Sequence, residues 1–186
     1  DGFLRNTGML STVLARLLPV FSAAVQTYLR GGSPATFERA MQQALARAHT
    51  AAYLRGLAER SAGGRVREWL ARLVGDRALP ATERAVLRAA LAEQFGHLSR
   101  FVSQLDTQSD AQVAARVGMY AASAKSSYWR AWAGAEMECY PGSCPECYSR
   151  CRCALDRRDD GVYWTGPGDA HSCGAGRGRI GKRMGK

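Results

Sequence analysis

The stretch CYPGSCPECYSRCRCALDRRDDGVYWTGPGDAHSC, residues 139–173, contains all six cysteines of the chain and one of its three histidines. Six candidate metal ligands fall into short pairs: Cys144 and Cys147 in a CxxC, Cys151 and Cys153 in a CxC, and His171 and Cys173 in an HxC. A CxxC bend brings two thiolates within reach of one ion, and a second pair arriving from elsewhere completes a tetrahedron with Zn–S bonds of about 2.3 Å. The spacing therefore predicts a small knuckle around one structural zinc ion.

Two other states of the cysteines stay open. The six could pair as three disulfides, in connectivities that the sequence does not choose among, or some could be buried apolar residues without a bond. Zinc is favoured over disulfides because the cysteines occupy only about a fifth of the chain, whereas disulfide-dependent small domains are cross-linked throughout. Within the zinc hypothesis Cys144 and Cys147 come first, two of the other four paired residues complete the site, and Cys139 stands outside the pairs.

Length and composition predict a globular protein. With 186 residues, 46% of them apolar and 23% charged, the chain suits a helical domain with a small appendage rather than a disordered polymer. A formal net charge of +10 favours polyanions or acidic protein surfaces as partners. A solvated basic surface without a partner is the alternative.

The apolar run at residues 9–25 predicts a packing helix and not a membrane span. Arg16 interrupts the run and Pro19 lies within it. Its apolar residues recur at steps of three and four, which is typical of an amphipathic helix. The broad face comprises Leu14, Leu17, Leu18, Phe21 and Val25. Because this face is wider than a surface helix needs, we expect the helical part to dock on other protein chains.

Start and stop signals predict four more helices, so the fold is expected to be mainly α with about five helices. Their ranges are 34–60, 65–74, 80–105 and 109–134. Ser33 followed by Pro34 is a typical helix start, and Ser109 with Gln112 three residues later forms a capping box. No helix contains a Ser-His-Asp arrangement, and no glycine-rich phosphate loop occurs, so we expect no enzymatic activity. His49 and His97 are expected to be ordinary helix residues.

The segment after the CxC predicts a short β-hairpin, with strands around residues 153–155 and 162–165 and a turn at Asp159, Asp160 and Gly161. The last residues are rich in glycine and predict a flexible basic tail. Five cations of that tail are expected to contact nucleic acid or an acidic surface: Arg177, Arg179, Lys182, Arg183 and Lys186. The expected organisation is a helical domain at 1–134, a cysteine-rich knuckle at 135–173 and the tail at 174–186.

A tyrosine-bearing helix, MYAASAKSSYWRAWAG, is followed by CPECYSRCRC and then by HSC. This order resembles the C-terminal module of tailed-bacteriophage minor head proteins, the phage head-morphogenesis family, over about residues 110–173. The family pattern has a longer loop with His and Pro before CRC, whereas here only Tyr148, Ser149 and Arg150 separate Cys147 from Cys151.

The resemblance implies a structural virion protein without chemistry of its own. Such a protein would be assembled in the host cytoplasm and would lie inside the head or near the portal vertex, against other capsid or portal proteins and near packaged DNA. The alternative is a zinc-knuckle nucleic-acid-binding protein, in which the tail contacts phosphates and Tyr163 or Trp164 stacks on bases. Glu136 and Glu138 beside the cysteines are typical of an open, hydrolytic zinc site, but a cysteine-rich ligand set favours a closed structural one.

Overall fold

The computed structural model describes residues 2–60, 79–134, 137, 139–143, 152–166 and 178–185. Four α-helices occur in this described part: α1 (Gly2–Leu29), α2 (Pro34–Arg60), α4 (Ala81–Val102) and α5 (Asp110–Ala133). Three strands form one antiparallel sheet: β1 (Ala154–Arg158), β2 (Gly161–Thr165) and β3 (Arg183–Gly185). The expectation of a mainly helical fold is confirmed. The expected helix at 65–74 lies outside the described residues.

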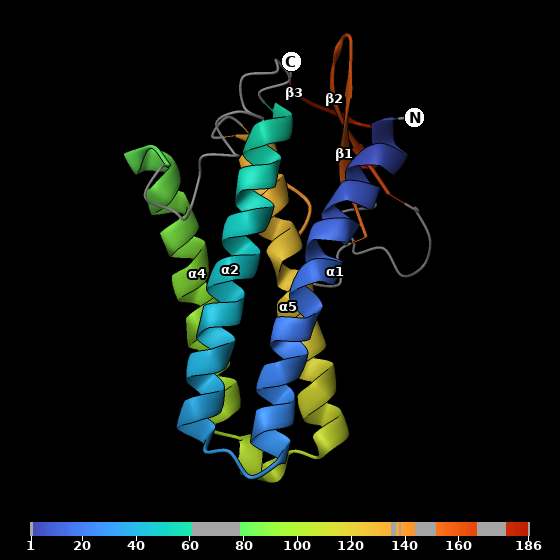
Figure 1. Cartoon of the computed structure of the whole chain (residues 1–186). Helices are drawn as coiled ribbons and strands as arrows, with labels where there is room; N and C mark the ends of the chain where they lie inside the picture. The colour runs from blue at the N-terminus through green and yellow to red at the C-terminus, as the bar shows by residue number, and fades with distance from the viewer. Residues whose placement is uncertain are drawn as a thin grey trace.

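The helices lie along one another, and the sheet sits at the end of the bundle where α1 begins and α5 ends (Figure 1). α2 is the central helix, because it packs against α1, α4 and α5. α4 packs chiefly on α2 and touches α5 at few places. This unequal packing leaves one side of α5 tightly covered and another side open.

Local chemistry explains where the helices begin and end. The Ser33 hydroxyl accepts a hydrogen bond from the backbone N–H of Thr36 at 3.2 Å, at the start of α2. At the start of α5 the Gln112 N–H donates to Ser109 Oγ at 3.3 Å, and the Ser109 N–H donates to Gln112 Oε1 at 2.8 Å. Both bonds satisfy N–H groups that a helix end leaves without a partner, so the predicted capping box is confirmed.

Two helix boundaries differ from the sequence-based expectation. α4 ends at Val102, and the chain continues as a separate 3-10 turn, η2 (Leu105–Thr107). α1 begins at Gly2 and continues through Pro19. Proline removes the hydrogen bond to the carbonyl four residues earlier, and here both Pro19 and Ala15 are exposed, so water can satisfy that carbonyl.

The backbones of α2 and α5 approach each other closely at Gly56. Ala48, Ala52 and Gly56 follow one another at four-residue steps, so they share one stripe of α2. A Cβ atom added to Gly56 would lie 2.2 Å from the carbonyl oxygen of Tyr128 and 2.9 Å from the Cβ of Ala131. Only a residue without a side chain permits this approach of the two backbones.

Two glutamates connect the helices through buried tyrosines. Glu59 on α2 accepts a hydrogen bond from the Tyr128 hydroxyl of α5 at 2.5 Å. Glu83 on α4 accepts from the Tyr53 hydroxyl of α2 and from Arg60 Nη2, the latter at 3.1 Å. Burial raises the pKa of both tyrosines, and the adjacent carboxylates raise it further, so both hydroxyls stay protonated and donate.

The apolar face of α1 is largely covered within the chain at its described side chains, which do not include that of Leu14. Phe21 and Val25 are buried in the core, and Leu17 packs against it. Leu18 is 47% exposed and borders a shallow apolar groove between α1 and α5. The width of the face is thus explained mostly by contacts with α2 and α5. Docking of this helix on another chain stays a prediction.

The predicted β-hairpin is confirmed, and it belongs to the core of the helices. Ala154 pairs with Thr165 and Arg158 with Gly161 around the turn at Asp159 and Asp160. Leu155 and Trp164 face each other across the strands and are both buried. They lie in the same hydrophobic cluster as the aromatic side chains at the end of α5. The third strand was not expected from the sequence.

Candidate functional site

Cys153 is the one predicted zinc ligand within the described residues. It directly precedes β1 and is 3% exposed. A Cβ atom added to Gly166, which directly follows β2, would lie 3.4 Å from Cys153 Sγ. The chain that arrives from the CxC and the chain that leaves toward the HxC therefore begin side by side at one end of the hairpin. This arrangement fits a knuckle in which the two pairs approach each other.

The other predicted ligands lie outside the described residues: Cys144, Cys147, Cys151, His171 and Cys173. Among the residues that the structure does describe, no group of three or more His, Cys, Asp or Glu side chains could hold a metal ion. That search does not reach the predicted set. A thiolate-rich set would supply a closed tetrahedral site that stabilises the fold.

Cys139 is in an environment that does not suit a metal ligand. Its half-buried Sγ accepts a hydrogen bond from Arg179 Nη2 at 3.1 Å, and within the described chain it forms no disulfide. The Arg179 guanidinium carbon also lies 5.3 Å from the centre of the Trp164 ring. A guanidinium at the sulfur opposes a second positive charge there. The position of Cys139 is consistent with its place outside the predicted ligand pairs.

The second half of the expected flexible tail is folded. β3 pairs with β2, with Tyr163 opposite Arg183. The backbone N–H of Trp164 donates to the Lys182 carbonyl at 3.1 Å, and the backbone N–H of Gly181 donates to the Trp164 carbonyl at 2.8 Å. The expectation of a free tail is therefore corrected for residues 178–185. Ile180 and Met184 pack against the core. As two apolar residues in a polar segment, they were the sequence signal that this segment is folded.

The predicted contact cations of the tail do not share one environment. Arg179 is used inside the fold, against Cys139 and Trp164. Lys182 and Arg183 are exposed on and beside the edge strand. Arg177 and Lys186 lie outside the described residues. Arg179 therefore has contacts within the fold, and its contact with phosphates stays a prediction.

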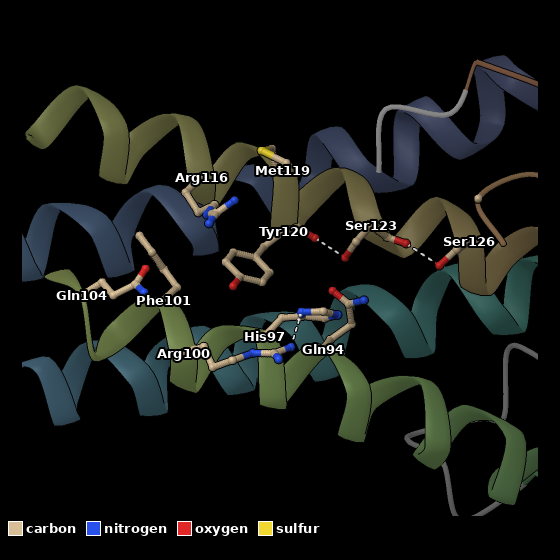
Figure 2. Close-up of a pocket in the computed structure, with 11 residues that line it drawn as sticks. Gln94, His97, Arg100, Phe101, Gln104, Arg116, Met119, Tyr120, Ser123 and Ser126 are labelled. Atoms are coloured by element: carbon tan, nitrogen blue, oxygen red, sulfur yellow. Dashed lines mark hydrogen bonds between the residues drawn. The ribbon is translucent and has the colours of Figure 1, made fainter. Parts of the chain in front are cut away.

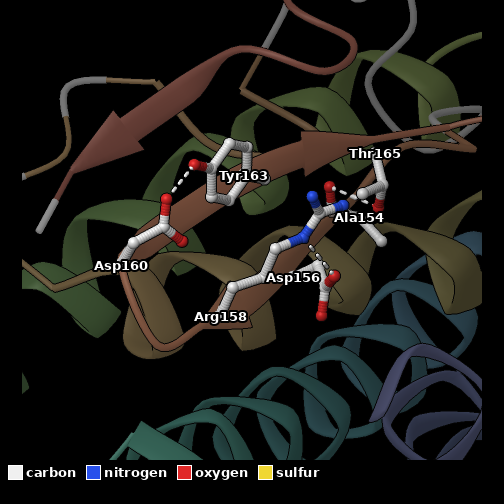
Figure 3. Close-up of polar contacts among 6 residues, drawn as sticks. All are labelled: Ala154, Asp156, Arg158, Asp160, Tyr163 and Thr165. Atoms are coloured by element: carbon white, nitrogen blue, oxygen red, sulfur yellow. Dashed lines mark hydrogen bonds and ion pairs between the residues drawn. The ribbon is translucent and has the colours of Figure 1, made fainter. Parts of the chain in front are cut away.

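The outer face of the hairpin is polar and mixed in charge (Figure 3). The Arg158 guanidinium lies 4.4 Å from the centre of the Tyr163 ring, and its Nε lies 3.2 Å from Asp156 Oδ2. The Tyr163 hydroxyl donates to Asp160 at 2.5 Å, which lowers the pKa of Asp160 and raises that of Tyr163. Trp164 is 1% exposed, which leaves Tyr163, the other residue expected to stack on bases, as the candidate for that contact.

His49 forms a buried polar network that the sequence analysis missed. It is 1% exposed, with Nδ1 at 2.7 Å from Ser127 Oγ and Nε2 at 3.0 Å from Ser123 Oγ. Ser123 donates its single hydroxyl hydrogen to the carbonyl of Tyr120, so it accepts from Nε2–H. Ser127 in turn donates to Nδ1. Burial lowers the pKa of His49 to about 4, which keeps the ring neutral at pH 7.

The network pairs a base, His49, with serine hydroxyls, as a catalytic site would. The burial of these groups favours a structural role instead. Ser127 is only 2% exposed, so a substrate could not reach its oxygen. Ser123 and Ser127 stand four residues apart on one face of α5, and that spacing was the available signal. The partner histidine is 74 to 78 residues away in the sequence.

Comparison with known protein families, characterised proteins and solved structures finds no match to this chain. Within the described residues, no helix combines the length and the apolar character that crossing a bilayer requires. Function is therefore inferred from the geometry above and from the resemblance of residues 110–173.

Proposed function

We propose that this protein is a structural component of a tailed-bacteriophage virion, a minor head or capsid-associated protein inside the head or near the portal vertex. The observation that carries the proposal is the continuity between α5 and the C-terminal module. Trp129 and Trp132 at the end of α5 lie in one hydrophobic cluster with Leu155 and Trp164 of the sheet. A helical bundle that rigidly presents a small module suits a connecting role in a large assembly.

Charge supports partners that are acidic. The formal net charge of +10 would attract an acidic capsid or portal surface, or packaged DNA, at long range. The proposal requires no reacting group, and the burial of His49, which is 1% exposed, is consistent with a structural role.

The direct test is the composition of phage particles produced by a strain that carries the gene. Quantitative mass spectrometry of purified heads should find the protein at a lower copy number than the major capsid protein, and deletion of the gene should reduce the yield of complete heads. A chain that is missing from purified heads, together with a normal yield after deletion, would reject the proposal.

A structural zinc ion is the second part of the proposal. It would be bound by Cys144, Cys147 and two of the remaining ligand candidates. Native mass spectrometry with and without chelator should show one zinc per wild-type chain and none in Cys147→Ser, because the loss of a CxxC thiolate opens the site. The far-ultraviolet helical signal should persist in this variant, since most residues of the hydrophobic core lie on the helices.

Cys139→Ser is the matched control, because the Cys139 thiol contacts Arg179 and stands outside the pairs. It should keep its zinc. If the purified protein contains no zinc and its cysteines resist alkylation until a reductant is added, the zinc hypothesis is wrong and the cysteines form disulfides.

Nucleic-acid binding is the second candidate function, and the exposed Lys182 and Arg183 favour it. Because residues 178–185 are part of the sheet, substitution tests the contact better than truncation. If both side chains contact phosphates, Lys182→Gln with Arg183→Gln should reduce the log–log salt slope for random duplex DNA by roughly 2. Arg39→Gln with Arg47→Gln, two exposed α2 positions, is the control. An equal slope in wild type and in the Lys182 and Arg183 variant would exclude this contact.

A further inference from the structure

A pocket of about 400 Å³ lies where α4 and α5 diverge (Figure 2). α4 supplies one wall, including His97, Arg100 and Phe101, and α5 supplies the opposite wall, including Arg116 and Tyr120. The volume falls in the range of pockets that take small organic molecules. No role proposed above uses this pocket.

One end of the pocket has an aromatic floor. Phe101 and Tyr120 are both buried, and their ring centres lie 6.1 Å apart at an interplanar angle of 41°. Met119 lies beside them on α5. A flat apolar group placed here would contact the parts of these rings that line the pocket and the polarisable thioether of Met119.

Two arginines border this aromatic end. Arg116 lies with its guanidinium carbon 5.7 Å from the centre of the Phe101 ring. Arg100 donates to His97 Nδ1 at 2.8 Å. Figure 2 shows the two arginines on either side of Tyr120. Burial raises the pKa of Tyr120, and the positive charges of Arg116 and Arg100 oppose that rise, which indicates that both charges act at its hydroxyl.

The charge of this end is not neutralised by the residues that the structure describes. Within that part of the chain, neither Arg100 nor Arg116 forms an ion pair with a carboxylate. Glu93 lies 3.7 Å from His97 Nε2 but does not line the pocket. Two arginines from different helices, above an aromatic floor, leave a net positive site for an anion.

The other end of the pocket has the opposite preference. Ser123 donates its hydroxyl hydrogen to the Tyr120 carbonyl, and Ser126 donates its own to the Ser123 carbonyl, both at 2.7 Å. Both hydroxyl hydrogens are therefore used within α5, and Ser123 Oγ also accepts from His49 Nε2–H, so neither hydroxyl is available to donate to an anion. A Cβ atom on Gly142 would lie 2.9 Å from Ser126 Cβ, so the backbone at Gly142 closes this end. An anionic group is consequently directed to the arginine end.

We propose that the pocket between α4 and α5 binds a small aromatic anion, whose phosphate or carboxylate lies at the end bordered by Arg100 and Arg116 and whose ring lies against Phe101 and Tyr120. Both components are needed: the guanidinium groups bind the anion through charge-assisted hydrogen bonds, and the aromatic floor binds the ring. The inference does not rest on the proposed virion function.

The test uses the full chain and three probes, phenyl phosphate, inorganic phosphate and benzyl alcohol, titrated by NMR and calorimetry. Phenyl phosphate should shift the resonances of Phe101 and Tyr120, with an affinity at least about tenfold above that of either other probe. Arg100→Gln with Arg116→Gln should weaken phenyl phosphate binding by at least about tenfold, because both positive charges are lost. Both side chains are exposed, so this variant should fold.

Arg39→Gln, an exposed arginine on α2 that does not line the pocket, should bind phenyl phosphate like wild type. The proposal is overturned if phenyl phosphate does not shift Phe101 and Tyr120 at millimolar concentration. It is also overturned if inorganic phosphate binds equally well, or if Arg39→Gln weakens binding as much as the double variant, since either result indicates general attraction to a basic protein.

Discussion

Helix α5 has two neighbouring faces that are packed in opposite ways. Toward α2, the backbones meet at Gly56, and His49 is enclosed with Ser123 and Ser127. Toward α4, the side chains leave a pocket of about 400 Å³ bordered by two exposed arginines. Helix α5 thus stabilises the fold through the side that faces α2, and its side toward α4 offers a surface for binding.

Side-chain size explains the difference. On α2 the alanines and Gly56 let the two axes approach closely. On α4 the residues toward α5 include Gln94, His97 and Phe101, which line the pocket without filling it. Close contact maximises dispersion and excludes water, whereas the open side retains hydrated polar groups.

The largest effect is expected from Gly56→Ala. The new Cβ would lie 2.2 Å from a backbone carbonyl oxygen, so α2 and α5 would have to separate. We expect a loss of about 3 kcal/mol in the free energy of unfolding, measured by chemical denaturation.

Gly96→Ala in α4 is the matched control, because nothing lies within 4 Å of its added Cβ. It should raise the free energy of unfolding by about 0.5–1 kcal/mol, since alanine favours the helix. If Gly56→Ala stabilised the protein in the same way, the close approach of α2 and α5 would be contradicted.

The second prediction concerns His49 and pH. Its pKa is lowered from 6.5 to about 4 in the folded protein, so below pH 6.5 the unfolded chain takes up a proton that the folded chain refuses. Stability should therefore fall as the pH falls from about 6.5 to about 4, by up to roughly 3 kcal/mol from this group. Denaturation midpoints across this range measure the loss.

His49→Gln supplies the comparison, because an amide can donate to Ser123 and accept from Ser127 but does not titrate. The decline between pH 6.5 and 4 should be shallower in this variant. Equal declines in the two proteins would mean that His49 is already protonated in the folded state, or that it is not buried.

The smallest effect is expected on the open face. Arg100→Gln with Arg116→Gln should change the free energy of unfolding by less than about 0.5 kcal/mol, because both side chains are exposed and neither has a carboxylate partner in the described chain. Thermal unfolding without ligand measures it. A loss of 2 kcal/mol or more, on the order seen for core contacts, would show that this face also stabilises the fold.

The sequence predicted those parts of the fold that depend on neighbouring residues. Ser33 with Pro34, and Ser109 with Gln112, marked helix starts because a cap acts within one turn. The turn at Asp159 to Gly161 marked the hairpin for the same reason. β3 was missed because its partner strand lies about twenty residues earlier, and glycines in the tail favoured a flexible segment.

The candidate sites, too, were predicted only where they depend on residues close together in the sequence. Spacing alone paired the cysteines and His171, and the structure adds that Cys153 and Gly166 lie together at one end of the hairpin. Which residues bind zinc stays a prediction. The pocket between α4 and α5 had no local signal, because Arg100 and Arg116 are brought together by helix packing and not by a motif.

By itself the sequence determined where most described helices begin and end, the hairpin turn and the cluster of candidate metal ligands, because each depends on contacts across a few residues. Only the tertiary structure decided that His49 would be enclosed by serines up to 78 residues away and that Arg179 would bind Cys139 across 40 residues. The physical reason is that burial, and the pKa shift it brings, depends on which distant surfaces meet. The type of a residue and of its sequence neighbours does not specify which distant surface it will pack against.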